Sequence, residues 1–331
     1  MRLRKKVYVR QSKILKNLKS NGMESLQTIK SRLRAVNNIG KITRAMEVVA
    51  ATKMRRAQEL AINARPYAFQ ALGLLSKLTD YKIPNVPLLS DREIKKTLMV
   101  IISSDRGLVG SFNTQVFRLV SEFIKSNLLT RENLEVITLG KKALSFADKN
   151  GHVIREKFLN FGNMVKPEQM ESVSELIIGG FLSDKWDRVV TISMNFKTTI
   201  LQAPLIREVF PVNFEMIKKT IKEIVPEHGR YSDLLDLVDI DRKETTEYIF
   251  EPSKEEVLNS LIPHLIKMQF YHLMLEANAS EHSARRVAMK TASDNADEVA
   301  GKLSMDYNKV RQSNITRELI EITSTQSALQ G

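Results

Sequence analysis

The sequence predicts an α/β fold with long helices, in which N- and C-terminal helices form an antiparallel coiled coil and a Rossmann-like α/β domain lies between them in sequence. Three observations carry this prediction. Residues 254–330 contain one proline and one glycine, so a single helix can run through them. Residues 24–80 form a second helical segment, and between the two segments short apolar runs alternate with helical patterns.

The C-terminal helix has a clear start. Pro252 precedes Ser253-Lys-Glu-Glu256, a capping box whose side chains satisfy backbone N–H groups of the first turn. Apolar side chains then recur three and four residues apart, from Leu258 to Val310, and the remaining seam positions are His272, Ala279, His282, Arg286 and Ser293. Such a helix would be about 110 Å long, so it must pack against another long element or be enclosed by other proteins.

The N-terminal helix carries a similar pattern. Its apolar stripe is predicted at Leu26, Ile29, Leu33, Val36, Ile39, Ile42, Met46 and Val49. Many alanines follow, and small side chains let a partner helix approach closely. Pro66 predicts a kink or a break. The two seams suit an antiparallel coiled coil.

The middle of the chain reads as an α/β domain. Buried strands are predicted at 97–103, 134–139 and 189–194, with 198–206 pairing beside the third, and helices at 116–124, 141–149 and 168–182. Strands that alternate with helices favour a largely parallel sheet. The predicted organisation is therefore a basic extension at 1–22, a coiled-coil helix at 23–80, the α/β domain at 81–252 and a second coiled-coil helix at 253–331.

The net charge of +13 is concentrated near the N-terminus, because residues 1–80 hold 18 Lys/Arg and 4 Asp/Glu. Such a segment can bind nucleic acid, anionic lipid or an acidic protein surface. Residues 1–22 contain no acidic residue and lack the apolar stretch of a secretory signal. They are a disordered tail, a frayed helical extension or a mis-started segment that precedes a true start at Met23, and they weakly resemble a transit peptide.

Composition excludes several kinds of chemistry. The chain has no cysteine, which excludes disulfides, thiol nucleophiles and cysteine-bound metals. Its five histidines are scattered, so no zinc site is predicted. No apolar run is long enough to span a membrane.

The string Ser103-Ser-Asp-Arg-Gly-Leu-Val-Gly110 follows a predicted buried strand and opens a helix, where α/β folds bind phosphate. It matches neither the P-loop nor the dinucleotide fingerprint. Asp105 could act as an acid or base, or could cap the turn. We interpret Asp105, Arg106, Gly107 and Gly110 as a structural turn, and we predict no catalytic residue, no cofactor and no metal.

Three sequence blocks resemble a known family. They are Ile39–Met54 with Arg65-Pro-Tyr67, Ser104–Gly110, and Ser280–Asn295 continuing through Tyr307–Ile322. On these blocks, the chain from Met23 onward is similar to the gamma subunit of F-type ATP synthases. Val109 stands where the family often has a cysteine.

The resemblance implies a non-catalytic rotor shaft that couples proton flow through a membrane ring to ATP synthesis at the beta-subunit sites. Its paired helices would sit inside a hexamer of alternating alpha and beta subunits, and its α/β domain would contact the epsilon subunit and the membrane c-ring. It implies no nucleic-acid partner and an indirect membrane association, and we expect a peripheral location on the cytoplasmic side of a bacterial inner membrane.

The resemblance also implies which residues contact the stator. These are Lys41, Arg44, Met46, Glu47 and Arg285 facing the acidic lever of beta, and Arg311, Gln312, Thr316 and Glu321 near the shaft tip. Two alternatives remain open on the residues alone: an α/β nucleotide-binding enzyme with a helical oligomerisation arm, and a basic coiled-coil protein that binds nucleic acid.

Overall fold

The computed structural model describes residues 25–79, 87–89, 92–161, 165–199, 201–212, 251 and 253–330. The predicted extension at 1–22 lies outside these residues. The chain divides into two compact units. We call Met1–Met46 with Met289–Gly331 the end unit, and Glu47–Ala288 the sheet unit.

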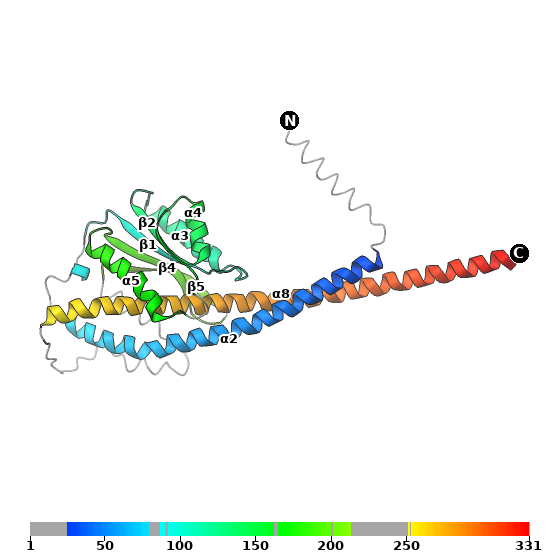
Figure 1. The fold of residues 1–331 in the computed structure, drawn as a ribbon, viewed down its shortest axis with the longest axis horizontal. Helices are drawn as coiled ribbons and strands as arrows, with labels where there is room; N and C mark the ends of the chain where they lie inside the picture. The colour runs from blue at the N-terminus through cyan, green and yellow to red at the C-terminus, as the bar shows by residue number, and fades with distance from the viewer. Residues whose placement is uncertain are drawn as a thin grey trace, which may run out of the picture. The chain divides into compact units, whose positions relative to one another are not determined.

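The sheet unit is built on five strands in the order β3-β2-β1-β4-β5 (Figure 1). Strands β1 to β4 pair in parallel, and β5 pairs antiparallel to β4. The prediction of a largely parallel sheet is confirmed. The strands are β1 (Thr97–Ile102), β2 (Leu134–Leu139), β3 (Val153–Phe158), β4 (Arg188–Phe196) and β5 (Gln202–Phe210).

Two strands differ from the prediction. Strand β3 was not predicted, because it lies at the sheet edge and its central residues Arg155, Glu156 and Lys157 are exposed. Strand β5 begins later than expected, since Thr198 and Leu201 close the preceding turn: Thr198 N donates to Leu201 O at 2.9 Å, and Leu201 N donates to Thr198 Oγ1 at 2.9 Å.

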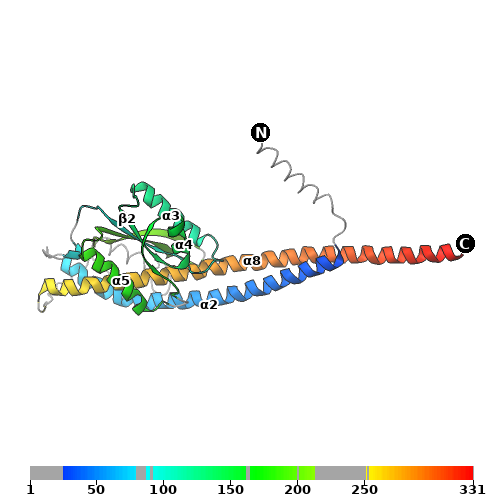
Figure 2. The same cartoon turned by 45° about the horizontal axis from the view of Figure 1, so that its top comes forward.

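Helices cover both faces of the sheet (Figures 1 and 2). Side chains of β1 point alternately to the two faces. On one face, Met99 and Ile101 pack with α3 (Phe112–Ser126) and α4 (Lys141–Lys149). On the other face, Leu98 and Val100 pack with α5 (Pro167–Leu182) and α8 (Lys254–Gln330). All three short helices were predicted within a few residues. The alternation is what a strand buried on both faces requires.

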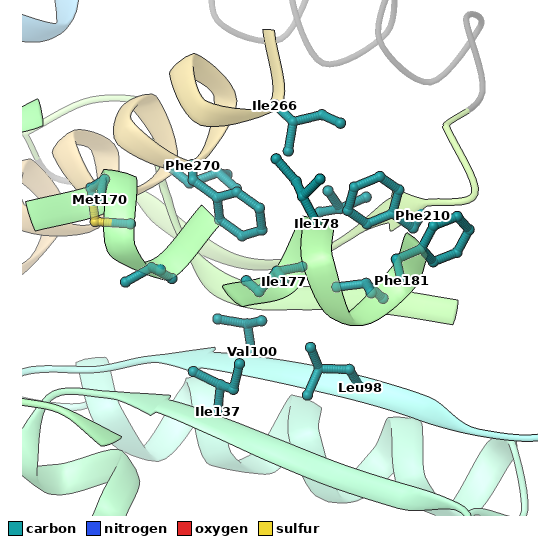
Figure 3. Close-up of a cluster of buried hydrophobic side chains, with 14 of the residues drawn as sticks. Leu98, Val100, Ile137, Met170, Ile177, Ile178, Phe181, Phe210, Ile266 and Phe270 are labelled. Carbon is teal, nitrogen blue, oxygen red and sulfur yellow. The ribbon is translucent and has the colours of Figure 1, made fainter. Parts of the chain in front are cut away.

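The core between the sheet, α5 and α8 is rich in large side chains (Figure 3). Phe181 and Phe210 are fully buried and stack with ring centroids 4.6 Å apart. Phe270 of α8 is also fully buried in this core. Each such side chain contributes roughly 1.5–3 kcal/mol by leaving water.

The first long helix, α2 (Leu26–Thr79), continues through Pro66, so the predicted break there is wrong. The predicted stripe is confirmed at Ile29, Leu33 and Val36, but it is wrong further along, where Ile39, Ile42 and Val49 are 53%, 59% and 51% exposed. In steps of four and three, every seam residue is instead buried or half-buried: Ile29, Leu33, Val36, Gly40, Thr43, Glu47, Ala50, Met54 and Ala57. From Gly40 to Ala50 the seam therefore contains mainly small residues, while the aliphatic residues Ile39, Ile42 and Val49 point outward.

The second long helix, α8, has the predicted bounds, and Ser253 Oγ accepts a hydrogen bond from Glu256 N at 3.2 Å. Arg286, predicted in its seam, is exposed. Around Met289 the seam agrees with the prediction, because Met289, Ser293 and Ala296 are buried at steps of four and three.

Helices α2 and α8 run antiparallel. In the end unit, Arg44 of α2 pairs with Asp297 of α8. In the sheet unit, Lys53 interacts electrostatically with Arg285. The α8 numbers fall as the α2 numbers rise, so the predicted antiparallel arrangement is confirmed.

Candidate functional site

The turn after β1 caps a neighbouring helix. Three oxygens of this turn accept hydrogen bonds from the first three N–H groups of α4. Asp105 Oδ1 accepts from Lys141 N at 3.0 Å, Ser104 O from Lys142 N at 3.1 Å, and Ser103 Oγ from Ala143 N at 2.6 Å. Because these N–H groups already have partners, a phosphate could reach them only by displacing the turn.

The approach of the turn to α4 depends on a glycine that the sequence interpretation did not name. Gly140 has φ of +99°, and a Cβ there would lie 2.3 Å from Ser103 O. Within the turn, Gly110 and Leu108 are left-handed, with φ of +55° and +62°. Gly107 has neither a left-handed φ nor any atom within 4 Å of an added Cβ. The geometry therefore requires glycine at 140 and favours it at 110, but not at 107.

Arg285 belongs to a compact group of charged residues. Its Nη2 donates to Glu281 Oε1 at 2.7 Å, and its Nη1 lies 3.2 Å from His282 Nδ1. The side chains of Arg285 and Glu281 are only 12% and 15% exposed. Charges of Lys53, Asp105 and Arg106 act on the same group.

Burial dominates the protonation of this group. Desolvation, with repulsion from Arg285 and Lys53, lowers the pKa of His282 to about 4. Burial also lowers the pKa of Lys53, and it raises the pKa of Glu281 against the opposing attraction of Arg285. His282 is therefore neutral at physiological pH, and the guanidinium of Arg285 is bonded to Glu281 within the cluster.

Sequence reasoning singled out Arg285 but missed Lys53, Glu281 and His282 as members of this cluster. Lys53 lies more than 200 residues from the others in sequence, and only the antiparallel pairing of α2 with α8 brings them together. The signal that could have found them is their place inside the sequence blocks that carry the resemblance.

The predicted contact residues of α2 lie on a mixed surface. Lys41 and Arg44 are exposed, and Met46 and Glu47 are half-buried. Arg44 Nη2 donates to Asp297 Oδ2 at 2.7 Å, in a pair that is more than half exposed on both sides. The exposed side chains of Ile39 and Ile42 lie in the same stretch of helix. Aliphatic and basic groups side by side are typical of a surface that binds another protein.

The end of α8 exposes both polar and apolar side chains. Arg311, Gln312, Thr316 and Glu321 are all exposed, and Thr316 Oγ1 donates to Gln312 O at 2.9 Å. Large aliphatic residues accompany them: Ile315, Leu319, Ile320 and Ile322 are 48%, 58%, 60% and 63% exposed. A helix whose large side chains face water here is suited to a protein environment that covers them.

The described part of the chain shows neither a metal site nor a membrane-spanning helix. Its residues include no group of three or more His, Asp or Glu side chains that could hold a metal ion. No described helix contains a stretch with the length and hydropathy of a membrane span.

Comparison with known proteins identifies relatives along nearly the whole chain. A family model described as ATP synthase matches residues 25–329. The ATP synthase gamma chain of Roseiflexus castenholzii is 36% identical over 310 residues, which cover 93% of this chain and 99% of that relative. The ATP synthase gamma chain of Trichlorobacter lovleyi is 36% identical over 313 residues, covering 93% and 100% of the two chains.

Solved structures share the fold. A chain in the central stalk and c-ring of the Tetrahymena thermophila mitochondrial ATP synthase matches with a TM-score of 0.54 and 24% identity, covering 76% of this chain and 99% of that one. A chain in the OSCP/F1/c-ring structure of the Euglena gracilis mitochondrial enzyme, in rotational state 3, matches with a TM-score of 0.58 and 18% identity, covering 92% and 94%.

Proposed function

Because the chain belongs to the gamma chain family of ATP synthase, we propose that it is the rotating central stalk that couples ion flow through a membrane ring to ATP synthesis. In this role it binds no substrate and performs no chemistry. It acts by presenting different surfaces to the catalytic subunits as it turns, which stabilises a different conformation in each of them.

The observation that carries the proposal is the outward face of the long helices. Helix α2 buries small residues at its seam and exposes Ile39 and Ile42, and the end of α8 exposes Leu319 and Ile322. Ordinary coiled coils bury their large aliphatic residues between the helices. Around Gly40, Thr43 and Ala50 this arrangement is reversed, which suits a shaft that is enclosed by other subunits.

A non-catalytic role is supported by the turn after β1. Nucleotide-binding α/β proteins use the loop at this position and the adjacent helix N-termini to hold phosphate. Here Ser103, Ser104 and Asp105 occupy the N–H groups of α4. This occupation counts against an anion site at α4, although α3, the helix that directly follows the turn, has no side-chain cap at Ser111.

The partners follow from the same role. We infer that the exposed parts of both helices contact a hexamer of alpha and beta subunits, and that the sheet unit contacts the epsilon subunit and the c-ring. The stator contacts would be made by Lys41, Arg44, Met46, Glu47, Arg285, Arg311, Gln312, Thr316 and Glu321. The protein would be peripheral to the cytoplasmic side of a bacterial inner membrane, without binding nucleic acid.

The proposal is tested by replacing the gamma chain of a bacterial host with a tagged copy of this chain. We expect solubilised membranes to yield alpha, beta, epsilon and c subunits with the tag, identified by mass, and vesicles to synthesise ATP. A chain that copurifies with none of these subunits, or with DNA in their place, would reject the proposal.

A single substitution tests the contact surface. Met46→Lys adds a positive charge among Lys41 and Arg44, so we expect ATP synthesis to fall more than the amount of assembled complex. Ser145→Lys, at an exposed position of α4, is the matched control. Unchanged synthesis in the Met46→Lys complex would remove this residue from the proposed contact.

A further inference from the structure

Part of α8 presents a buried polar stripe to strand β5. His272, Glu276 and Ser283 are 8%, 6% and 0% exposed. Their spacings of four and seven residues put them on one face of the helix. The apolar members of α8 in the adjoining core, which begin at Leu258, end at Ala277. The polar stripe therefore begins beside the last apolar core residues of α8 and continues beyond them.

The first contact of the polar stripe is an ion pair. Arg207 Nη1, on β5, donates to Glu276 Oε2 at 3.0 Å, and the two side chains are 4% and 8% exposed. His272 Nε2 lies 3.2 Å from the other carboxylate oxygen of Glu276. Burial alone would raise the pKa of Glu276, but Arg207 and His272 lower it to about 2. Glu276 is therefore ionised inside the protein.

The second contact lies two helical turns further along α8. Ser283 Oγ donates to Thr199 O at 2.5 Å, in the turn between β4 and β5. Gln202 Nε2, at the start of β5, lies 3.3 Å from Ser283 Oγ. Together with the ion pair, this contact fixes β5 to α8 at two points about 10 Å apart along the helix axis.

Stability alone does not explain such a joint. A buried ion pair is often no more stabilising than apolar side chains of similar size, because removing charges from water is costly. Between the two contacts, the buried side chains of α8 include three small ones, Ala277, Ala279 and Ser280, and the only large buried ones are the polar Asn278 and His282. Small side chains make shallow ridges, which resist sliding of α8 along β5 poorly. An ion pair and a hydrogen bond, in contrast, form only when the two elements are aligned in one register.

We propose that the polar stripe locks the register of α8 against β5, so that torque passes between the sheet and α8 without slip. Arg207, Glu276 and Ser283 are then positioning residues in coupling: they act through α8 and contact no catalytic site. The inference rests on the proposed rotor function.

The test uses the assembled ATP synthase in inverted membrane vesicles. The double variant Arg207→Met/Glu276→Leu removes both charges and keeps similar volumes, so no single buried charge is left without its partner. The control, Arg118→Met/Glu122→Leu, removes an exposed ion pair of α3. ATP hydrolysis and acidification of the vesicle interior are measured together, and the ratio of pumping to hydrolysis is the readout.

We expect the double variant to assemble and hydrolyse ATP while its ratio of pumping to hydrolysis falls at least about threefold, and we expect about a twofold fall for Ser283→Ala. The control should keep the wild-type ratio. A wild-type ratio in the assembled double variant would overturn the proposal. Failure of the double variant to assemble would overturn it too, because the pair would then serve folding. If the unsubstituted chain supports no pumping, the rotor function itself fails.

Discussion

The sheet unit and the end unit bury different kinds of side chain. The sheet unit encloses large residues such as Phe181, Phe210 and Phe270, which are fully buried. The end unit buries Gly40 and Ala296 at its helix contact and leaves Ile42 and Leu319 exposed. The sheet unit therefore covers its large aromatic side chains within the chain, whereas the described part of the end unit exposes large apolar side chains that we expect partner subunits to cover.

The strongest test of this difference compares one aromatic residue with one exposed aliphatic residue. We expect Phe181→Ala to destabilise the purified chain by about 3–5 kcal/mol, because it removes a fully buried ring that stacks on Phe210. We expect Leu319→Ala, at a 58% exposed position, to change stability by less than about 0.5 kcal/mol. Thermal unfolding followed by circular dichroism measures both. Equal losses would contradict the contrast between the units.

The Leu319→Ala variant can also be tested in the assembled complex. There, Leu319→Ala should weaken retention of the chain by the alpha and beta subunits during purification, although it leaves the isolated chain intact. Unchanged retention would show that this side chain is not covered by a partner.

A pH series tests the buried cluster of the sheet unit. His282 titrates with a pKa of about 4 in the folded chain, against 6.5 when unfolded. Above pH 6.5 it is neutral in both states and contributes nothing. As pH falls from 6.5 towards 4, the unfolded chain takes up a proton that the folded chain does not, so stability falls, by about 2 kcal/mol at pH 5.

The measurement is the change of Tm between pH 7 and pH 5, compared with the same change in His282→Gln. The variant should lose less stability on acidification than the wild type. Ser145→Gln, at an exposed position of α4, is the control and should behave as the wild type does. Identical pH profiles for wild type and His282→Gln would show that His282 is not held neutral by its surroundings.

The cap of α4 gives a smaller effect. Asp105→Ala removes the acceptor for Lys141 N, and we expect a loss of about 1 kcal/mol in unfolding free energy. Asp148→Ala, near the other end of α4, is the control at an exposed position. If Asp105 instead belonged to a nucleotide site, ATP would raise the Tm of the wild type and would not raise that of the variant.

The smallest expected effect lies in the end unit. A Cβ added at Gly40 would lie 3.5 Å from Ala296 Cβ, which is an ordinary contact. Gly40→Ala should therefore stabilise the chain by roughly 0.5–1 kcal/mol, since glycine is a poor helix former. Gly301→Ala, where nothing lies within 4 Å of an added Cβ, should give a similar gain. Gly40→Leu should destabilise the chain, and tolerance of leucine would mean that the helices are not closely packed there.

Apolar runs made much of the sheet unit predictable. Strand β2 and helices α4 and α8 have the predicted bounds, because their apolar spacing and their flanking residues agree. Strand β3 was missed because an exposed edge strand needs no apolar residues at its centre. The α2 seam was misplaced for a related reason: Gly40, Thr43 and Ala50 are too small to stand out beside Ile39, Ile42 and Val49 in a hydrophobic pattern.

The candidate contacts were predictable only through the resemblance. The charge and the periodicity of the sequence did not distinguish Arg44 and Arg285 from other charged residues of the helices. No local pattern predicted that Lys53 would lie near Glu281 and His282. Their association depends on which turns of two distant helices lie side by side, and that alignment is set by packing along the entire seam.

The capped N-terminus of α4 has a consequence for a rotor in the cell. Enzymes that turn over ATP work among freely diffusing nucleotides and inorganic phosphate, and a shaft that bound them would stiffen or relax with the metabolic state. Because Ser103, Ser104 and Asp105 already occupy the first N–H groups of α4, we expect this helix N-terminus to take up no anion as nucleotide levels change.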